Sequence, residues 1–238
     1  MCYNYSYLQK RGLKSARRSG EISEQKYQEQ VLQLNAVKLS DSIAVDEDVE
    51  EQLVFPGMEA PVITLENLVV EDFQFGFLPE WSKDYKDFRK NFNSRSETIL
   101  EKPTWRTAFK KNQRCLIISS GFFEENKITK QRYRFTQKKN VPLIFAGIYN
   151  LWTDKTEGTL FHTMAIITCE ANEVVAPFHN RMPVILKSEA QEKWLDKKIN
   201  YQTAFELLQP FSAGEMMAEE TNPLPRKKKN NPQLGFDF

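Results

Sequence analysis

The sequence predicts an α+β fold, with mainly antiparallel strands in the core and helices at the periphery. Short apolar segments recur along the chain without the regular strand–helix alternation of parallel α/β folds. Helical spacing of apolar residues is confined to residues 24–39 and 188–208. The 238 residues, 40% of them hydrophobic, are enough to bury a sizeable core.

The predicted strands are rich in β-branched and aromatic residues and are separated by Gly, Pro and Ser turn signals. They cover residues 3–8, 61–64, 68–70, 73–78, 115–118, 122–125, 145–149, 162–168 and 183–186. The acidic run 46–51 is expected to be an exposed linker. In the C-terminal helical region, one or two helices are expected after Ser188 as the N-cap.

Two regions of unequal size are predicted: a folded domain over residues 1–220, and a disordered basic tail over 221–238. The tail combines prolines and lysines and ends in alternating apolar residues. This ending resembles the short peptides with which bacterial replication proteins dock on the sliding clamp. The docking residues would be Gln233, Leu234, Phe236 and Phe238. The alternative is a frayed end without a partner.

Composition argues against several classes of function. Three cysteines without CxxC spacing and only two histidines give no basis for a disulfide framework, a metal site or a cofactor. No apolar run is long enough to span a membrane. With a net charge of only +1, any basic surface must come from uneven distribution. We expect a cytoplasmic monomer that is associated with the nucleoid when bound to DNA.

Cys2 is the first candidate for chemistry. Removal of Met1 would leave it with a free α-amine beside its thiol, and these groups titrate near ~8 and ~8.5. Such a 1,2-aminothiol condenses with an aldehyde to an imine and then closes a thiazolidine ring. The thiol alone could instead attack an amide as an N-terminal nucleophile. On these two residues alone, a cysteine without function is the simpler interpretation.

Two further residues are candidates for proton transfer. Glu124 stands where an apolar strand resumes after a Ser-Ser-Gly break, and partial burial there would raise the pKa of its carboxyl. His179 lies in a polar turn before a Pro-led apolar strand, which suits an acid or base. Glu125 is expected to be exposed, and His162 to be a strand residue without a role.

Aromatic and basic residues are interleaved in two places, a pattern that suits single-stranded nucleic acid. Trp81 stands beside Lys83 in a loop after the aromatic strand, where an indole often faces a ligand. Trp105 and Arg106 are followed by basic residues up to Arg114. By composition alone this signal is weak.

Five motifs in the same order resemble the SRAP (SOS response-associated peptidase) family over residues 1 to about 210. They are Met1-Cys2, residues 75–84 (FGFLPEWSKD), 93–98 (NSRSET), 114–124 (RCLI to GFFE) and 170–186 (EAN to HNRMPVIL). Each motif is modest, but the ordered set is specific. The resemblance implies a barrel-like SRAP fold and a protein that crosslinks covalently to abasic sites in single-stranded DNA.

The resemblance also implies roles for residues. The catalytic positions of the family fall on Cys2, Asn93, Glu124 and His179. Its DNA-contacting arginines fall on Arg95 and Arg106. The full set predicted to contact DNA is Arg95, Arg106, Trp81, Phe75, Lys83 and Arg181.

The chain departs from the family pattern near its start. The family commonly opens Met-Cys-Gly-Arg, whereas Tyr3 and Asn4 stand here, so one basic residue is absent. Phe75 replaces a usual Trp. Two alternatives to crosslinking stay open: a thiol peptidase that uses the same residues to cleave its own N-terminus, and a non-covalent module that binds single-stranded DNA.

Overall fold

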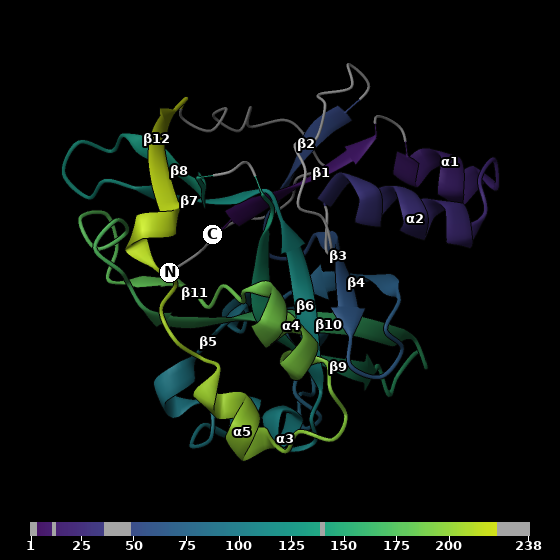
Figure 1. Ribbon diagram of the computed structural model, residues 1–238. Coiled ribbons are helices and arrows are strands. Elements are labelled where there is room, and N and C mark those ends of the chain that lie inside the picture. The colour runs from purple at the N-terminus through teal and green to yellow at the C-terminus, as the bar shows by residue number, and fades with distance from the viewer. Residues whose placement is uncertain (1–3, 11–12, 36–48, 139–140, 223–238) are drawn as a thin grey trace.

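A computed structural model describes residues 4–10, 13–35, 49–138 and 141–222 (Figure 1). The strands are β1 (Asn4–Lys10), β2 (Val49–Val54), β3 (Glu59–Thr64), β4 (Val70–Phe75), β5 (Asn93–Arg95), β6 (Arg114–Ser119), β7 (Gly121–Glu125), β8 (Arg132–Gln137), β9 (Leu143–Thr153), β10 (Leu160–Glu170), β11 (Arg181–Pro183) and β12 (Met216–Thr221). The helices are α1 (Leu13–Ser19), α2 (Glu24–Asn35), α3 (Pro103–Lys110), α4 (Ser188–Trp194) and α5 (Tyr201–Glu206), with 3-10 turns η1 (Tyr85–Lys90), η2 (Ser96–Thr98) and η3 (Ala213–Glu215).

Five strands close into a barrel. Strand β10 pairs with β4, β4 with β3, β3 with β6, β6 with β9, and β9 again with β10. All of these pairs are antiparallel except β10–β4, which is parallel. The short strands β5 and β11 extend the sheet by pairing with β10. Closure removes the open edges that a flat sheet of this size would present.

The second sheet has the order β12-β8-β7-β1-β2 and is antiparallel throughout. Because β6 ends at Ser119 and β7 begins at Gly121, the chain passes almost directly from the barrel into this sheet. Tyr5 of β1 packs edge-on against Phe75 and Phe145 of the barrel, with ring centroids 5.5 and 5.8 Å apart. The inner face of the second sheet therefore lies on the barrel.

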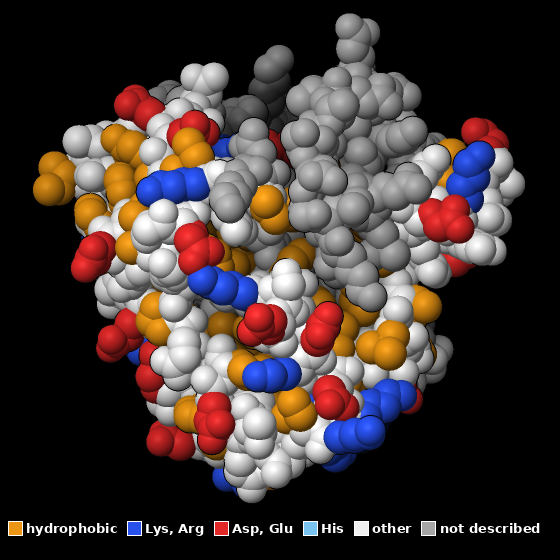
Figure 2. Space-filling view, in the orientation of Figure 1, with side chains coloured by type: hydrophobic (Ala, Val, Ile, Leu, Met, Phe, Trp, Pro, Cys, Tyr) orange, Lys and Arg blue, Asp and Glu red, His pale blue; other side chains and the backbone are white. Residues whose placement is uncertain are grey.

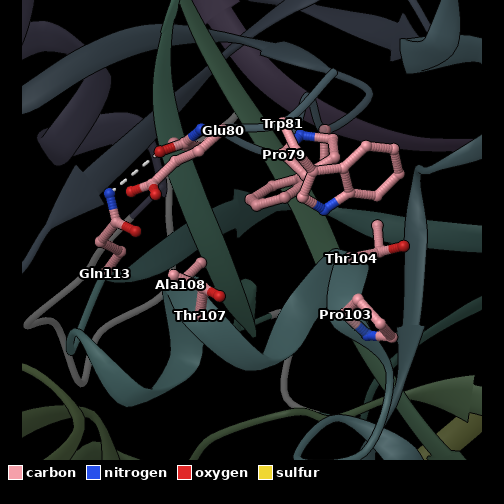
Figure 3. A pocket seen from close by; sticks show the side chains of 10 residues that line it. Pro79, Glu80, Trp81, Pro103, Thr104, Thr107, Ala108 and Gln113 are labelled. Atoms are coloured by element: carbon pink, nitrogen blue, oxygen red, sulfur yellow. Dashed lines mark hydrogen bonds between the residues drawn. The ribbon is translucent and has the colours of Figure 1, made fainter.

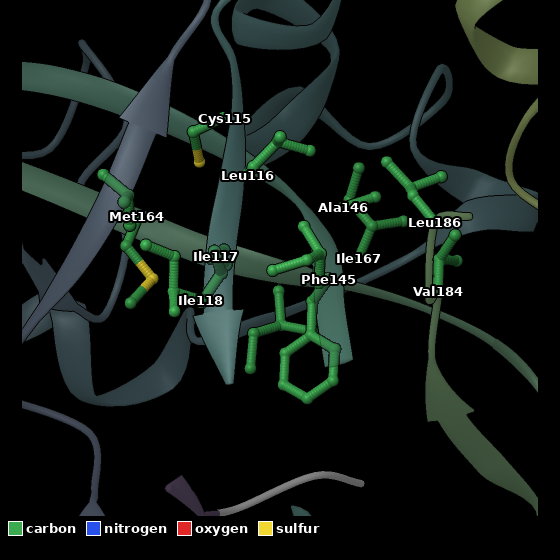
Figure 4. Packing of buried hydrophobic residues seen from close by; sticks show 14 of the residues in the cluster. Cys115, Leu116, Ile117, Ile118, Phe145, Ala146, Met164, Ile167, Val184 and Leu186 are labelled. Atoms are coloured by element: carbon green, nitrogen blue, oxygen red, sulfur yellow. The ribbon is translucent and has the colours of Figure 1, made fainter. Parts of the chain in front are cut away.

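Apolar side chains from β6, β9 and β10 fill the barrel (Figure 4). Leu116, Ile117, Phe145, Ala146 and Ile167 are among the residues with almost no exposed surface. Burial on both faces explains why these strands read as continuous apolar runs rather than as alternating patterns. The core thus gives a rigid support to the strand ends that carry the candidate site.

The helices form two groups at the periphery (Figure 1). Helices α1 and α2 lie beside β1 and β4, where Arg17 and Tyr27 bond the buried Asp72. Helices α3, α4 and α5 form the second group, in which the rings of Trp194 on α4 and Phe205 on α5 lie 6.2 and 6.5 Å from the ring of Phe109 on α3. Trp194 of α4 anchors that group by donating from its indole to the carbonyl of Cys115, 3.0 Å away. No helix among the described residues has the length and apolarity needed to cross a membrane.

The structure confirms the α+β class and the barrel-like, mainly antiparallel core. Three local expectations were wrong. Glu50 and Glu51 lie in β2 rather than in a linker, residues 68–69 lie in the connection between β3 and β4, and the N-cap of α4 is Lys187 rather than Ser188. Residues 36–39 of the predicted helix and 223–238 of the tail lie outside the described residues. The domain boundary at residue 220 stays a prediction.

Candidate functional site

The site is built around the N-terminal end of β1. Asn4 is the first described residue, and its partner across β7 is Phe123, the residue before Glu124. Strand β1 follows the expected β pattern of residues 3–8 over its described part. Cys2 itself lies outside the described residues. The described part of the site therefore consists of the groups that surround the start of β1.

Glu124 faces the space between the two sheets. Side chains alternate along a strand, so Glu124 shares the inner face of β7 with Phe122, which stacks on Phe135 at 4.9 Å. Its cross-strand partner is Tyr133 of β8. Burial raises the pKa of the Glu124 carboxyl to about 7, an effect that the Lys127 charge reduces. Glu125 points to the other face and is exposed, as expected.

His179 comes from the connection between β10 and β11. Its neighbour Phe178 packs against Tyr133 and Phe135 of β8, with ring centroids 4.4 and 5.3 Å apart. Since Tyr133 is the cross-strand partner of Glu124, this packing brings the histidine turn to the strand pair that carries the carboxyl. Lys127 acts electrostatically on both Glu124 and His179, which places the two groups in one neighbourhood.

The imidazole of His179 has a fixed orientation. Its Nδ1 accepts a hydrogen bond from the backbone N–H of Arg181 at 2.9 Å. In the neutral ring the proton then resides on Nε2. Burial is the main cause that lowers the pKa of His179, so the ring is mostly neutral at pH 7. Glu124 and His179 thus have pKa values displaced in opposite directions.

Asn93 begins β5 and pairs with Ile166 of β10. The preceding Phe92 contacts Phe75 edge-on at 5.9 Å, and Phe75 in turn contacts Tyr5 of β1. A chain of aromatic rings therefore links the start of β5 to β1. The amide of Asn93 is fixed on a strand of the barrel extension, so it can orient a neighbouring group without titrating.

Arg181 ties the asparagine segment to the histidine turn. Its guanidinium donates to both carboxylate oxygens of Glu97 at 2.7 and 2.8 Å, and to the Thr168 carbonyl at 2.6 Å. Glu97 belongs to η2, which directly follows β5. The hydrogen bonds from Arg181 lower the pKa of Glu97. This bidentate pair fixes the two segments relative to each other.

Comparison with known proteins decides the family. The family model SOS response associated peptidase (SRAP) matches residues 15–224. The chain belongs to the SRAP family. The matched range starts after Cys2, so the family assignment rests on the rest of the chain. It confirms the resemblance that the ordered motifs indicated.

Individual SRAP-like proteins agree with this assignment. The chain is 37% identical over 166 residues to the abasic site processing protein YoqW of Bacillus subtilis (strain 168), which covers 68% of this chain and 73% of YoqW. It is 33% identical over 167 residues to the abasic site processing protein HMCES of Gallus gallus, covering 60% of this chain and 50% of HMCES. A crystal structure of a Bacteroides thetaiotaomicron protein superimposes with a TM-score of 0.73 at 30% identity, over 97% of each chain.

The basic residues predicted to contact DNA in this SRAP protein lie at the surface. Arg95 follows Asn93 on β5, Arg106 lies on α3, and Lys83 lies in the loop after Trp81; all three are exposed. On the face shown in Figure 2, basic and acidic side chains are intermixed rather than separated into zones.

Trp81 lies over a small cavity of about 110 Å³ beside α3 (Figure 3). The indole is 58% exposed and faces Pro103 and Thr104 at the start of the helix. Gly76 redirects the chain after β4 with a φ of +135°, and a Cβ there would lie 2.8 Å from the Phe88 ring. This turn starts the loop that presents Trp81 to solvent, as an indole that binds a base requires.

Two predicted DNA contacts occupy more buried positions. Phe75 has no exposed surface and packs between Tyr5 and Phe92, so stacking on a base would require its ring to leave the core. Arg181 is 7% exposed and is already bonded to Glu97. Both contacts stay predictions, and the structure gives each residue a supporting role within the protein.

Sequence reasoning assigned Arg114 to a basic DNA patch, and this was wrong. The residue is fully buried, and its guanidinium donates to the carbonyls of Trp194, Asp196 and Ile199. Its guanidinium donates hydrogen bonds to backbone carbonyls at and just after the end of α4, rather than to a phosphate. Arg132, by contrast, drew no attention in the sequence, although its side chain reaches the start of β1. Neither contact has a local sequence signal, because the partners lie at least 80 residues away.

Proposed function

We propose that Cys2, exposed by removal of Met1, forms a thiazolidine crosslink with abasic sites in single-stranded DNA. The observation that carries this proposal is the desolvated Glu124 carboxyl, with a pKa raised to about 7, beside the strand that leads back to Cys2. The names of YoqW and HMCES, abasic site processing proteins, agree with abasic-site processing as the function of this chain.

The other cysteines are unsuited to the reaction. Cys115 and Cys169 are buried, and burial raises the pKa of both thiols, that of Cys169 to about 12. A thiolate is the reactive form, so neither residue is an effective nucleophile at neutral pH. Cys2 is separated from Asn4 by two peptide units, which limits its Cα to within about 8 Å of that residue. Asn4 pairs with Phe123, the residue before Glu124, so a tether of this length is long enough for Cys2 to approach Glu124.

The proposed chemistry requires no oxidant or reductant. The abasic deoxyribose opens to an aldehyde, and the α-amine of Cys2 adds to C1′ to give a carbinolamine. Loss of water from the carbinolamine gives an imine. The thiolate adds to the imine carbon, a C–S bond forms, and the nitrogen takes a proton. One water is released in total, and the product is a five-membered ring with carbon bonded to nitrogen and sulfur.

Glu124 and His179 divide the proton transfers. With a pKa of about 7, a large fraction of Glu124 remains protonated at neutral pH and can donate to the hydroxyl that leaves as water. His179, neutral because burial lowers its pKa, carries its proton on Nε2 and can donate a hydrogen bond from there to the sugar ring oxygen during ring opening. Pairs of titratable groups displaced in this way are typical of acid–base sites. Asn93 would orient the amine or the sugar hydroxyls.

DNA would be held by contacts outside the chemistry. Arg95 and Arg106 would bind phosphates that flank the lesion, and Trp81 would stack on a neighbouring base. A duplex would keep the sugar within its stack, so single-stranded DNA is the expected substrate.

Denaturing electrophoresis tests the proposal directly. The parent protein should form an adduct that survives denaturant with a single-stranded oligonucleotide carrying one abasic site. A tetrahydrofuran analogue, which cannot open to an aldehyde, should give none. Cys2→Ala should abolish the stable product, and so should a form that retains Met1, because its Cys2 nitrogen is an amide. Equal adduct from Cys2→Ala and the parent would exclude thiazolidine chemistry.

A second candidate function is peptide hydrolysis with Cys2 as an N-terminal thiol nucleophile. The description of the matching family as a peptidase favours it. Crosslinking requires both amine and thiol, whereas attack on an amide requires the thiol alone. Acetylating the α-amine while leaving the thiol free should therefore abolish crosslinking. Cleavage of a peptide by the acetylated protein would support the peptidase and oppose the crosslinking role.

A further inference from the structure

Tyr133 of β8 adjoins both groups that are assigned to proton transfer. It is the cross-strand partner of Glu124, so the two side chains stand on the same face of the sheet, with Cβ atoms roughly 5 Å apart. Its ring packs against Phe178, with centroids 4.4 Å apart and an interplanar angle of 47°. Phe178 is the residue before His179. Tyr133 therefore lies where the carboxyl strand and the histidine turn meet.

The ring of Tyr133 ends a row of aromatic side chains on this face. Phe122 stacks on Phe135, with centroids 4.9 Å apart. Phe135 contacts Phe178 edge-on at 5.3 Å, and Phe178 contacts Tyr133. The first two rings have no exposed surface, whereas the last two are half-buried. The row thus begins in the core and ends at the surface, and the ring that carries a hydroxyl is at the end that a ligand can reach.

The hydroxyl of Tyr133 is available for a ligand. It forms no hydrogen bond with any described residue, and the contact that holds the ring is made with the apolar Phe178. By contrast, the hydroxyls of Tyr27, Tyr85 and Tyr149 donate to side chains from other segments of the protein. A phenolic hydroxyl has one proton to donate and can also accept. The site therefore offers a neutral donor beside Glu124 and His179.

The abasic deoxyribose presents an oxygen that requires such a donor. When the sugar ring opens, the C1′–O4′ bond breaks. O4′ takes a proton and becomes the C4′ hydroxyl, while the C1′ hydroxyl loses its proton and becomes the aldehyde. Negative charge develops on O4′ as the bond breaks, and a donor already directed at an oxygen of this kind lowers the barrier. An ether oxygen has two lone pairs, so it can accept from a second donor besides His179.

We propose that the Tyr133 hydroxyl donates a hydrogen bond to the ring oxygen of the abasic deoxyribose, and then to the C4′ hydroxyl that this oxygen becomes. The inference rests on the function proposed above and names a further substrate contact for it. Tyr133 would stabilise charge on the oxygen without giving up its own proton. Because the contact strengthens as the ring opens, it acts on the rate more than on the affinity for DNA.

The first test removes one hydroxyl and nothing else. Tyr133→Phe keeps the ring against Phe178, and Tyr201→Phe makes the same change on α5, at another half-buried tyrosine. Single-turnover crosslinking at saturating abasic single-stranded DNA should be slower by roughly fivefold for Tyr133→Phe, as expected for one neutral hydrogen bond. It should be unchanged for Tyr201→Phe. The Kd for DNA with a tetrahydrofuran residue, whose ring cannot open, should change by less than about twofold in both variants.

A second substrate tests which atom Tyr133 contacts. Periodate cleavage of a diol linker within the strand gives an acyclic aldehyde, which has no ring to open and no C4′ hydroxyl. On this substrate Tyr133→Phe and the parent should crosslink at the same rate. A slower Tyr133→Phe on the acyclic aldehyde would overturn the inference. A weaker Kd for tetrahydrofuran DNA with an unchanged rate at saturation would also overturn it, because Tyr133 would then contact the DNA backbone.

Ring opening can also be followed without the crosslink. In a Cys2→Ala protein, methoxyamine condenses with the opened aldehyde to an oxime ether and releases water. Adding Tyr133→Phe should slow this capture on bound abasic DNA by a similar factor, and adding Tyr201→Phe should not. If the parent gives no crosslink, the proposed function fails, and the capture rates still decide whether Tyr133 assists ring opening. If the parent and Tyr133→Phe crosslink abasic DNA equally fast, the inference fails and the proposed function stands.

Discussion

Glu124 and Glu97 lie on the two segments that flank the site, and their surroundings differ. Glu124, on the inner face of β7, has a pKa raised by burial to about 7. Glu97, on η2, has a pKa lowered by the bidentate hydrogen bonds from Arg181. The first carboxyl is held in a form that can exchange a proton at neutral pH. The second is an anion at neutral pH.

The difference separates chemistry from positioning. A carboxylate paired with arginine cannot deliver a proton near pH 7, but it can join two segments with defined geometry. A carboxyl whose pKa burial raises to about 7 is less favourable for stability at high pH, and the same feature makes it a usable acid. The β7 side of the site would therefore supply the acid Glu124, whereas the η2 side would hold Asn93 and His179 in position.

The largest effect on the crosslinking rate is expected from replacing Glu124, with the replacement of Glu97 as its comparison. Glu124→Gln should slow crosslinking at saturating DNA by about 10²–10³-fold, within the range of general acid–base catalysis. Glu97→Gln, the matched control, should change this rate far less, since its carboxylate is not assigned to proton transfer. Single-turnover rates from denaturing gels measure both. Equal slowing by the two substitutions would remove the distinction between the segments.

The pH dependence should sharpen the comparison. If protonated Glu124 is the acid, the crosslinking rate of the parent should fall as pH rises through about 7, where the carboxyl loses its proton. Glutamine cannot titrate, so Glu124→Gln should lack that decline and keep only the rise caused by deprotonation of the α-amine near ~8. Rates measured between pH 5.5 and 9 in buffers of constant ionic strength, about the range that brackets both groups, give the two profiles. An alkaline decline that survives in Glu124→Gln would assign it to another group.

The contributions of Glu124 and Glu97 to folding stability should depend on pH in opposite directions. Because burial raises the pKa of Glu124 to about 7, its contribution to the free energy of unfolding is fully present below about pH 4.5. That contribution is lost as pH rises through 7, and the free energy of unfolding changes by roughly 3 kcal/mol between the two limits. Glu124→Gln should therefore melt higher than the parent at pH 8 but not at pH 4. The lowered pKa of Glu97 makes its contribution present above the ordinary carboxyl range and lost on acidification. Glu97 is 46% exposed, so Glu97→Gln should lose only about 1 kcal/mol at pH 7.

Thermal melts at pH 4, 7 and 8, about the values named above, measure these changes in stability. An increase of roughly 2–4 °C per kcal/mol is expected for a chain of this size. Glu125→Gln is a suitable control, because that residue is exposed on the opposite face of the same strand. A stabilisation of Glu124→Gln that did not depend on pH would contradict the desolvated carboxyl.

The sequence could predict those features of the core and the site that have a local pattern of residues. The apolar runs around 115–118, 145–149 and 162–168 became β6, β9 and β10, because strands buried on both faces have a local signature. Glu124 was recognisable as a carboxyl where such a run resumes, and its neighbour Glu125 as exposed. His179 was recognisable as a histidine in a polar turn before a Pro-led apolar strand, whereas Asn93 required the ordered family motifs.

Contacts between distant segments could not be predicted. Glu51 was assigned to an acidic linker, yet in β2 it accepts hydrogen bonds from Ser6 and Ser120. Arg114 appeared to continue a basic surface, but the carbonyls that bury it belong to the end of α4. The link from Arg132 to Asn4 spans 128 positions. Charge and spacing along the chain carry no information about such partners.

Smaller effects are expected from the basic residues that would contact phosphates. Arg95→Ala or Arg106→Ala should weaken binding to single-stranded DNA several-fold and reduce the salt dependence of log Kd by about 0.7 each. The crosslinking rate at saturating DNA should be nearly unchanged. Fluorescence anisotropy between 50 and 300 mM salt, roughly the range over which screening changes most, measures the slopes. Lys138→Ala, a basic residue at the end of β8, serves as the comparison.

The smallest effect concerns residues 233–238, which lie outside the described residues. Gln233 would enter a polar pocket of a bacterial sliding clamp, and Leu234, Phe236 and Phe238 its apolar groove. The preceding proline- and lysine-rich residues would act as an extended tether. Tethering would raise the local concentration of the catalytic domain on replicating DNA without any new contact at the site. It would therefore leave the rates of the isolated reaction unchanged.

A peptide of the last ten or so residues should bind the clamp with a Kd of tens of micromolar, about what a single short motif provides. Gln233→Ala with Phe238→Ala should abolish that binding, because the first removes the polar anchor and the second an apolar one. In the full-length protein the same double substitution should leave crosslinking to abasic single-stranded DNA at the parent rate. Titration calorimetry on the peptide and gel assays on the protein measure the two properties separately. Absence of binding by the intact protein at tens of micromolar would exclude a clamp partner, while a slower crosslink in the double variant would instead give these residues a place near the site.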